Sequence, residues 1–383
     1  MGLIDDLELK LTALKSEFGF RSIKPLSNGS EKYLNIKGKK ILNLASNNYL
    51  GLSCNEKIKI MAIEAINKFG TGASSSRLIT GNNSIYDELE GELSDFKRKP
   101  ASLVLNSGYC ANLAALSLAK NCDIFMDRLC HASLIDGAIL AGARFHRFQH
   151  NDLDHLERLL KNSDKSKIIV TESIFSMDGD SCDLVNLVNI SKKYDAFLIV
   201  DEAHATGIFG NGRGLSYELS VDKDIHLSVG TFSKALGSLG GYLSADKVVI
   251  DYIVNFARPL IFTTALPPSV LAANLAAVRF VRGNPSYGSQ LLKISNNLRE
   301  YLKSLGFNTL KSSSQIIPII LGDSKRTLMA QDFLSNIGIF VAAIREPTVP
   351  KNSARLRVSL RSDLTVDELE FIKQSFFSLA GQI

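Results

Sequence analysis

The sequence of 383 residues lacks the features of several specialised protein classes. It has no dense basic run, and its net charge of +5 is spread along the chain, so nucleic acid is not an expected partner. No apolar run is long enough to span a bilayer, and the acidic segment Met1 to Asp6 does not resemble a secretory signal. The five cysteines form no CxxC pair, which favours a reduced, cytoplasmic protein over a disulfide framework.

No internal repeat or low-complexity segment interrupts the chain, and strands and helices are expected to alternate from about residue 83 to 280. The expected strands are residues 102–105, 124–126, 144–148, 167–171, 197–200 and 227–229. Several are continuous apolar runs, as in a parallel sheet covered by helices on both faces. The pattern therefore predicts an α/β fold.

The two ends of the chain predict smaller elements. Leu3 to Phe18 has helical apolar spacing, residues 33–44 suggest a hairpin around Lys37-Gly38, and residues 56–69 suggest a helix. After a boundary near Pro285, the pattern predicts helices at about 287–304 and 365–379 and strands at 316–321, 339–341 and 354–360. We therefore expect an N-terminal segment (1–45), a large domain (46–284) and a small C-terminal domain (285–383).

Polar residues follow several of the predicted strands of the large domain. They lie in segments 106–109, 172–176, 201–204 and 231–234. Because the carboxyl ends of parallel strands share one edge of a sheet, these side chains are expected at one site.

Lys234 follows the apolar run 225–229 and precedes Gly237, Gly240 and Gly241. In a pocket of small residues, desolvation lowers the pKa of a lysine, and a neutral amine can form a Schiff base with an aldehyde. The alternative is a surface lysine in a glycine-rich turn.

Asp201 ends a predicted buried strand, where a carboxylate needs a cationic partner or several donors. A protonated heteroaromatic nitrogen meets that need, and His204 can donate to a phenolic oxygen on the same ring. The alternatives are a helix-capping or structurally paired aspartate and a hydrogen-bonded core histidine.

Two further segments suit the same ligand. Ser107 to Asn112 is a strand-to-helix turn in which Gly108 permits a phosphate to approach free N–H groups, although many such turns bind nothing. His131 stands at a predicted helix start, where an imidazole can stack on a ring or serve a structural role. An aldehyde, a ring nitrogen, a ring face and a phosphate together describe pyridoxal 5′-phosphate (PLP), an electron sink.

Two other cofactor hypotheses fit less well. The loop Gly70 to Arg77 follows a helix and lacks the third glycine of a dinucleotide fingerprint, which disfavours a nicotinamide-dependent dehydrogenase. His146, His150 and His155 run from a strand through a loop into a helix and need not converge, so no metal site is expected.

Six segments between about Arg21 and Arg357 together resemble one enzyme family. They are residues 46–52 (SNNYLGL), 107–112, 128–134, 172–180 (ESIFSMDGD), 200–207 (VDEAHATG) and 231–237. The set is similar to that of the α-oxoamine synthases, which are PLP enzymes of fold type I. The resemblance implies a large, mostly parallel seven-stranded sheet domain with a smaller C-terminal α/β domain.

The resemblance also implies a role for each matching residue at the cofactor. Lys234 would bind PLP covalently and then move the α-proton of the amino acid, and Asp201 would pair with the pyridinium nitrogen. His131 would stack on the ring and face the substrate, and Glu172 would lie near the reacting centre. Ser176 and His204 would bind the ring oxygen. The phosphate would be held by Gly108, Tyr109 and Thr231.

Substrate positions follow from the same resemblance. Asn47 and Arg357 would hold the amino-acid carboxylate, and Arg21 and Thr348 would line the path of the acyl donor. The family's sites lie between two subunits, which implies a homodimer. Thr263 or Thr264, after an apolar segment at 260–262 that suggests a strand, would reach the partner subunit's phosphate.

Residues 344–350 (IREPTVP) and 354–357 (ARLR) look most like the family member that condenses L-alanine with a pimeloyl thioester, although Glu346 stands where that member is expected to have proline. Along 354–361, Arg355 and Arg357 share one strand face, where one can bind a carboxylate while the other stays at the rim; a solvated face is the alternative. Rival functions are a glycine C-acetyltransferase and a non-catalytic PLP-binding protein.

Overall fold

The computed structural model describes residues 2–16, 19–23, 25–26, 29–36 and 38–382. The chain divides into two compact units. The small unit comprises residues 1–46, 177–179 and 293–383, and the large unit comprises residues 47–176 and 180–292. The division at residues 45/46 and 284/285 expected from the sequence stays a prediction.

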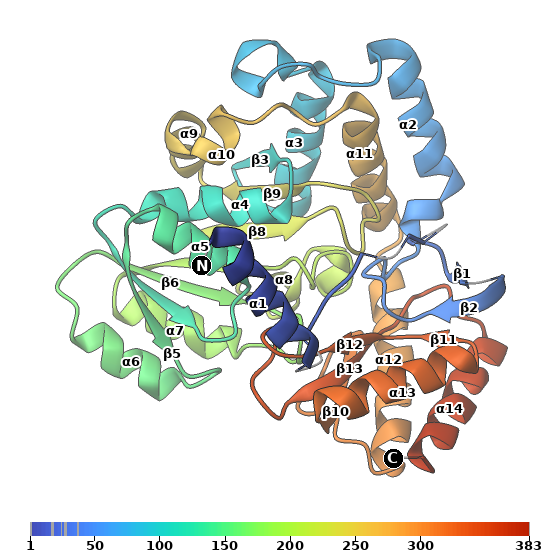
Figure 1. Cartoon of the computed structure of the whole chain (residues 1–383). Coiled ribbons are helices and arrows are strands. Elements are labelled where there is room, and N and C mark those ends of the chain that lie inside the picture. Colours follow the sequence, from blue (N-terminus) through green and yellow to red (C-terminus); the bar gives the residue numbers. More distant parts are fainter. Residues whose placement is uncertain (1, 17–18, 24, 27–28, 37, 383) are drawn as a thin grey trace. The chain divides into compact units, whose positions relative to one another are not determined.

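A seven-stranded sheet forms the centre of the large unit, which is an α/β structure as predicted (Figure 1). Its strands, in spatial order, are β3 (Ala101–Leu105), β9 (Gly241–Ala245), β8 (Leu227–Thr231), β7 (Ala196–Asp201), β6 (Lys167–Glu172), β4 (Asp123–Asp127) and β5 (Arg144–Phe148). Only β9 runs antiparallel to its neighbours. The six other strands therefore end at one edge, as the sequence predicted.

Alternation along the buried strands assigns side chains to two apolar layers. Ile124 and Met126 of β4 join a cluster with residues of four helices, α4 (Gly108–Ala115), α5 (Ala132–Leu140), α9 (Lys247–Phe256) and α10 (Arg258–Ile261). Phe125 joins a second cluster with residues of α6 (Leu153–Lys161) and α7 (Leu184–Lys193). Both faces of the sheet are therefore covered by helices, which explains the continuous apolar runs of β4 and β6. Figure 1 shows α6 and α7 beside β5, and α6 contacts both β4 and β5.

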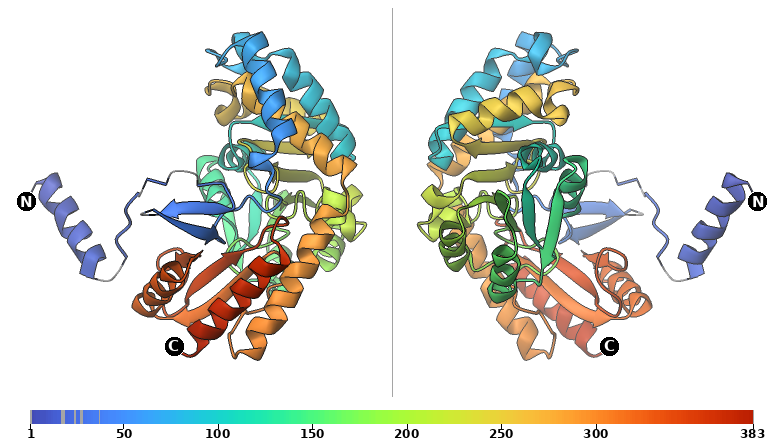
Figure 2. Two further views of the ribbon diagram at one scale, coloured as in Figure 1. Left: turned by 90° about the vertical axis from the view of Figure 1, so that its right-hand side faces the viewer. Right: turned by 90° about the vertical axis from the view of Figure 1, so that its left-hand side faces the viewer.

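Ten helices of the large unit surround this sheet. They are α2 (Glu56–Phe69), α3 (Ser84–Lys97), α4 (Gly108–Ala115), α5 (Ala132–Leu140), α6 (Leu153–Lys161), α7 (Leu184–Lys193), α8 (Leu215–Glu218), α9 (Lys247–Phe256), α10 (Arg258–Ile261) and α11 (Pro268–Gly283). In both views of Figure 2, α11 packs with α2 and α3, and the contacts between these helices agree.

The small unit holds two three-stranded sheets. One consists of β1 (Tyr33–Ile36), β2 (Lys39–Asn43) and β11 (Ile339–Phe340), and the other of β10 (Ile316–Gly322), β13 (Ala354–Ser359) and β12 (Ala342–Ile344). Its helices are α1 (Leu3–Ser16), α13 (Ser324–Asn336), α14 (Val366–Ala380) and most of α12 (Tyr287–Ser304). The antiparallel β1–β2 pair confirms the predicted hairpin. Lys37 and Phe18 lie outside the described residues.

Three local predictions differ from the structure. Residues 260–262 are not a strand: Pro259 stands in the first turn of α10, and a short apolar run alone does not distinguish a helix from a strand. The predicted strand 339–341 is present as β11 but ends at Phe340, and a second strand that was not predicted, β12, follows it in a different sheet. Strand β9 was missed because it follows a glycine-rich turn. Among the described helices, none has the length and apolar composition needed to cross a membrane.

Candidate active site

The turn after β8 carries Lys234 at the carboxyl edge of the large sheet. Thr231 is the last residue of β8, and its Oγ1 lies 3.5 Å from Nζ of Lys234. Phe232 is fully buried and anchors the turn, while Gly237 has a φ of 67°. A Cβ at Gly237 would lie 2.3 Å from the backbone nitrogen of Ser53, so both the conformation and the space require glycine. The turn therefore fixes the chain on both sides of Lys234.

Asp201, the last residue of β7, is 6% exposed, and its carboxylate accepts two hydrogen bonds. Its Oδ2 accepts from Nδ2 of Asn112 at 2.8 Å, and its Oδ1 accepts from the backbone N–H of Ala203 at 2.8 Å. Both donors are neutral, and no ion pair to Asp201 occurs within the described part of the chain. A buried carboxylate with only neutral donors is suited to a cationic ligand atom.

A hydrogen-bonded relay connects Asp201 to His131. The Nδ2 atom of Asn112 also donates to Oγ of Ser133 at 2.9 Å, and this oxygen lies 2.7 Å from Nδ1 of His131. His131 caps α5, and although the residue is exposed in this chain, partial desolvation of its ring lowers its pKa. Asn112 and Ser133 stood within the quoted motifs but were given no role, because sequence spacing does not show that they meet.

Glu172 ends β6 and is 3% exposed. Its Oε1 accepts a hydrogen bond from the backbone N–H of His131 at 2.5 Å, so Glu172 holds the backbone at the residue that carries the imidazole. Burial raises the pKa of Glu172 well above its ordinary value, and the charge of Asp201 also raises it. The N–H of His131 and the charge of Lys234 lower it by smaller amounts. The site therefore favours the protonated form of Glu172.

His204 lies 2.8 Å through Nδ1 from the hydroxyl of Tyr49, which donates to Oδ1 of Asn47 at 3.0 Å. His204 and Tyr49 are both buried. The predicted cofactor ligand His204 and the predicted substrate ligand Asn47 thus belong to one hydrogen-bonded chain. Tyr49 connects them, and no spacing rule identifies this role of Tyr49 from the sequence.

The turn from β3 into α4 places a helix N-terminus beside Thr231. Ser107 caps α4 by accepting the N–H of Cys110 at 3.0 Å. A Cβ on Gly108 would lie 2.3 Å from Cγ2 of Thr231, so only glycine allows this approach. The first N–H groups of a helix lack partners within the helix and attract anions, so the turn is suited to a phosphate. Tyr109 follows and donates to Asp136.

These elements enclose one cavity of about 190 Å³. It is lined by Ser107, Gly108, Tyr109, Asn112, His131, Ser133, Glu172, Asp201, Ala203, His204, Thr231, Ser233 and Lys234. The structure thus brings together seven of the eight residues predicted to hold the cofactor. Ser176, the eighth, belongs to the large unit but does not line the cavity.

The predicted substrate residues Arg21, Thr348 and Arg357 belong to the small unit. Nη2 of Arg21 donates to Oγ1 of Thr348 at 3.0 Å. Arg357 is 5% exposed and donates to Oγ of Ser359 at 2.8 Å, whereas Arg355 pairs with Asp178. The buried strand excludes the alternative of a solvated face for the two arginines. The backbone oxygen of Thr264 accepts from Asn106 at 2.6 Å.

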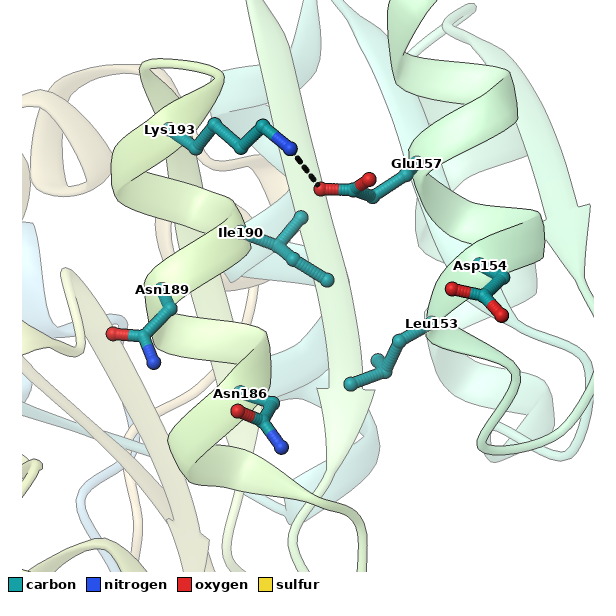
Figure 3. A pocket seen from close by; sticks show the side chains of 7 residues that line it. All are labelled: Leu153, Asp154, Glu157, Asn186, Asn189, Ile190 and Lys193. Atoms are coloured by element: carbon teal, nitrogen blue, oxygen red, sulfur yellow. Dashed lines mark hydrogen bonds and ion pairs between the residues drawn. The ribbon is translucent and has the colours of Figure 1, made fainter.

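A second and larger cavity lies between α6 and α7 (Figure 3). It measures about 390 Å³ and is lined by Leu153, Asp154, Glu157, Asn186, Asn189, Ile190 and Lys193. Figure 3 shows Lys193 and Glu157 joined across it, and the ion pair is 2.7 Å long. Two of its three charged side chains, Lys193 and Glu157, pair with each other at the surface, and no predicted site residue lines it, so the smaller cavity remains the candidate active site.

PLP fits the residues of the smaller cavity. Lys234 offers an amine, Asp201 an acceptor for a protonated ring nitrogen, and the α4 N-terminus with Thr231 a set of donors for a phosphate. His131 and His204 line the same cavity, where an imidazole can stack on a ring or bond to its oxygen.

Comparison with known proteins decides the family. Residues 39–374 match the family model described as aminotransferase class I and II. The chain belongs to this family. Its α-oxoamine synthase character, predicted from the motifs, is confirmed, as are fold type I and the dependence on PLP.

Three relatives illustrate the likeness of this α-oxoamine synthase to known members. A Bacillus mycoides protein named "Putative 8-amino-7-oxononanoate synthase" is 44% identical over 382 residues, which cover 98% of this chain and 97% of that protein. A variant of serine palmitoyltransferase from S. paucimobilis with bound PLP–myriocin aldimine is 30% identical, with a TM-score of 0.93 and full coverage of both chains. The 8-amino-7-oxononanoate synthase from Francisella tularensis is 29% identical, with a TM-score of 0.77, over 89% of this chain and 97% of that one.

Proposed function

We propose that this enzyme condenses L-alanine with a pimeloyl thioester and releases 8-amino-7-oxononanoate, carbon dioxide and the free thiol. The thiol is coenzyme A or a carrier protein. The reaction would serve biotin synthesis, in a cytoplasmic homodimer whose two subunits share their sites. The names of the full-length relatives and the segment 344–350 support this choice of substrates.

The observation that carries the proposal is the burial of Asp201 between two neutral donors at the edge that also presents Lys234. When bound, PLP withdraws electrons from the α-carbon of an attached amino acid. Asp201 would keep the ring nitrogen protonated, so that this withdrawal is strong. Asn112 and the N–H of Ala203 hold the carboxylate in place for that task.

Lys234 would hold the cofactor through its amine and then take the α-proton of alanine, which makes the α-carbon a nucleophile for the thioester carbonyl. His131 would stack on the ring, oriented through Ser133 and through its own N–H on Glu172. His204 and Ser176 would donate to the ring oxygen. Asn47, Arg357, Arg21 and Thr348 would bind the two substrates, and their roles follow from the resemblance alone.

One observation favours a second candidate within the same family. The serine palmitoyltransferase match covers the whole of both chains with a TM-score of 0.93, above the 0.77 of the 8-amino-7-oxononanoate synthase. An α-oxoamine synthase that uses another amino acid or acyl chain, such as a glycine C-acetyltransferase, is therefore the alternative.

Thiol release with each amino acid and each thioester distinguishes these candidates. We expect turnover with alanine and pimeloyl thioester, a product of the mass of 8-amino-7-oxononanoate, and a shift of the cofactor's visible band with alanine but not with glycine. Turnover with serine or glycine and another acyl thioester, but not with alanine and pimeloyl thioester, would select the alternative. Any turnover excludes a non-catalytic PLP-binding protein.

The role of Asp201 is tested with Asp201→Asn. The amide retains the shape of the side chain but not its charge, and a hydrogen bond to a charged group contributes roughly 1.5–3 kcal/mol. We expect a folded protein that no longer exchanges the α-proton of alanine with deuterated water. Exchange at the wild-type rate would show that Asp201 does not have the proposed role.

A further inference from the structure

His150 lies between two carboxylates, in the turn that follows β5. Its Nδ1 is 3.1 Å from each carboxylate oxygen of Asp127, and its Nε2 is 2.8 Å from Oδ2 of Asp180. An imidazole can donate from both nitrogens only as the cation. Its side chain is 21% exposed, so these contacts are partly shielded from water.

The charges around His150 favour that cation. Burial alone would lower the pKa of His150, but the hydrogen bonds and charges of Asp127 and Asp180 outweigh burial and raise the pKa to about 10. Since this value lies above the ordinary 6.5, the cation persists at neutral pH and is lost only as the pH rises through about 10.

Asp127 connects His150 to the segment that presents His131. It is the last residue of β4, and its Oδ1 accepts the N–H of Leu129 at 2.8 Å. Its backbone oxygen accepts the N–H of Cys130 at 3.1 Å, and His131 follows directly. These two hydrogen bonds hold the turn between Asp127, which His150 contacts, and His131.

Asp180 connects His150 to the segment that contains Ser176. Its backbone oxygen accepts the N–H of Phe175 at 3.0 Å, and Ile174 pairs with Ser181 in a β-bridge. The Phe175 ring also meets the imidazole edge to face, with centroids 4.4 Å apart at 88°. His150 thus contacts both sides of the base of this loop, and Ser176 follows Phe175 directly.

We propose that His150 is a positioning residue that clamps Asp127 to Asp180 and thereby sets the two loops that hold His131 and Ser176 at the cofactor. The inference rests on the proposed roles of His131 and Ser176. His150 itself does not line the cavity, so it acts through its two carboxylates. Loss of the clamp should weaken PLP binding without removing any group that contacts PLP.

The test is titration of PLP into the apoproteins of His150→Gln, Asp180→Asn and the double variant, followed by absorbance. We expect each single variant to raise the PLP dissociation constant roughly tenfold or more, and the double variant to be no weaker than the weaker single one, because both changes open the same contact. The control is His226→Gln. His226 precedes β8 at the amino edge of the sheet and accepts a hydrogen bond from the N–H of Leu198 at 2.9 Å. Its replacement should change the PLP dissociation constant by no more than about twofold.

A second measurement does not depend on the stability of His150→Gln. The ring ¹⁵N shifts of His150 should show the cation at about pH 8 in the wild-type apoprotein, and a lower titration midpoint in Asp180→Asn. Wild-type PLP affinity in both single variants, additive losses in the double variant, or a neutral His150 at about pH 7 would overturn the clamp. A wild-type apoprotein that does not bind PLP would contradict the proposed function as well, and so separates the two failures.

Discussion

Asn112 donates one hydrogen bond to the Asp201 carboxylate at 2.8 Å and a second to Ser133 at 2.9 Å from the same nitrogen. The amide stands on α4, and the carboxylate ends β7 at a distance of 89 residues along the chain. This contact joins the helix that would face the phosphate to the acceptor for the ring nitrogen. It therefore couples two parts of the cofactor site.

Asn112→Leu should slow the exchange of the α-proton of alanine. The change removes a donor to a charged group, which contributes roughly 1.5–3 kcal/mol and corresponds to a loss of about ten- to hundredfold. Exchange is measured by NMR in deuterated water. Ser133→Ala is the comparison variant: it removes the second acceptor of Asn112 and a contact of His131, but it leaves the donor to Asp201 in place and should cost less. Equal exchange rates in Asn112→Leu and wild type would contradict a role for this amide.

Glu368 should make the fold sensitive to acid. Burial alone would raise its pKa, but it accepts from the hydroxyl of Tyr33 at 2.5 Å, from the N–H of Thr365 at 2.7 Å and from Nζ of Lys32 at 3.0 Å, and these donors hold the pKa at about 2. Because this value lies below the ordinary 4.5, the contribution to stability is present above pH 4.5 and is lost as the pH falls through about 2.

Urea unfolding at about pH 5 and about pH 3 measures this effect. Glu368→Gln should be less stable than wild type at the higher pH and should lose less stability between the two. Glu370→Gln is the control on the same helix, since Glu370 forms only an exposed pair with Lys373. If Glu368→Gln and wild type lose equal stability on acidification, Glu368 does not account for the acid sensitivity.

Lys97→Met should destabilise the large unit strongly. Nζ of Lys97 lies 2.6 Å from Oε2 of Glu202, and the two side chains are 3% and 0% exposed. Removing one partner leaves a buried charge without its counterion, which costs about 3–5 kcal/mol. Lys247→Met, which removes an exposed pair with Asp251, should cost about 0.5 kcal/mol or less. Equal urea midpoints for the two variants would contradict this account of the buried pair.

The sequence was most informative where a residue's environment follows from its place on a strand. All six predicted strands of the large sheet are present, because continuous apolar runs bounded by turns leave few alternatives. The carboxyl-edge rule then placed Asp201, Thr231 and Lys234 around one cavity without knowledge of their contacts.

The sequence was least informative where a residue's partner is distant in the chain. Asn112 is buried on an apolar helix, and its bond to Asp201 requires the packing of α4 against the sheet. Tyr49 belongs to an N-terminal turn, yet its hydroxyl meets His204 across 155 residues. In the sequence, His150 suggests at most a metal ligand, whereas both of its ring nitrogens face carboxylates in the structure. Such contacts arise from tertiary packing, which periodicity and local propensity do not encode.

The central claim is that Lys234 holds the cofactor covalently, and reduction with borohydride tests it most directly. Wild-type protein is saturated with PLP, reduced and digested, and the masses of its peptides are measured by mass spectrometry. The Lys234→Ala variant, treated in the same way, is the control. We predict that the peptide containing Lys234 gains the mass of the reduced cofactor and that no peptide of the variant does. An unmodified Lys234 peptide in folded, PLP-treated protein, or a label on another lysine, would contradict the account.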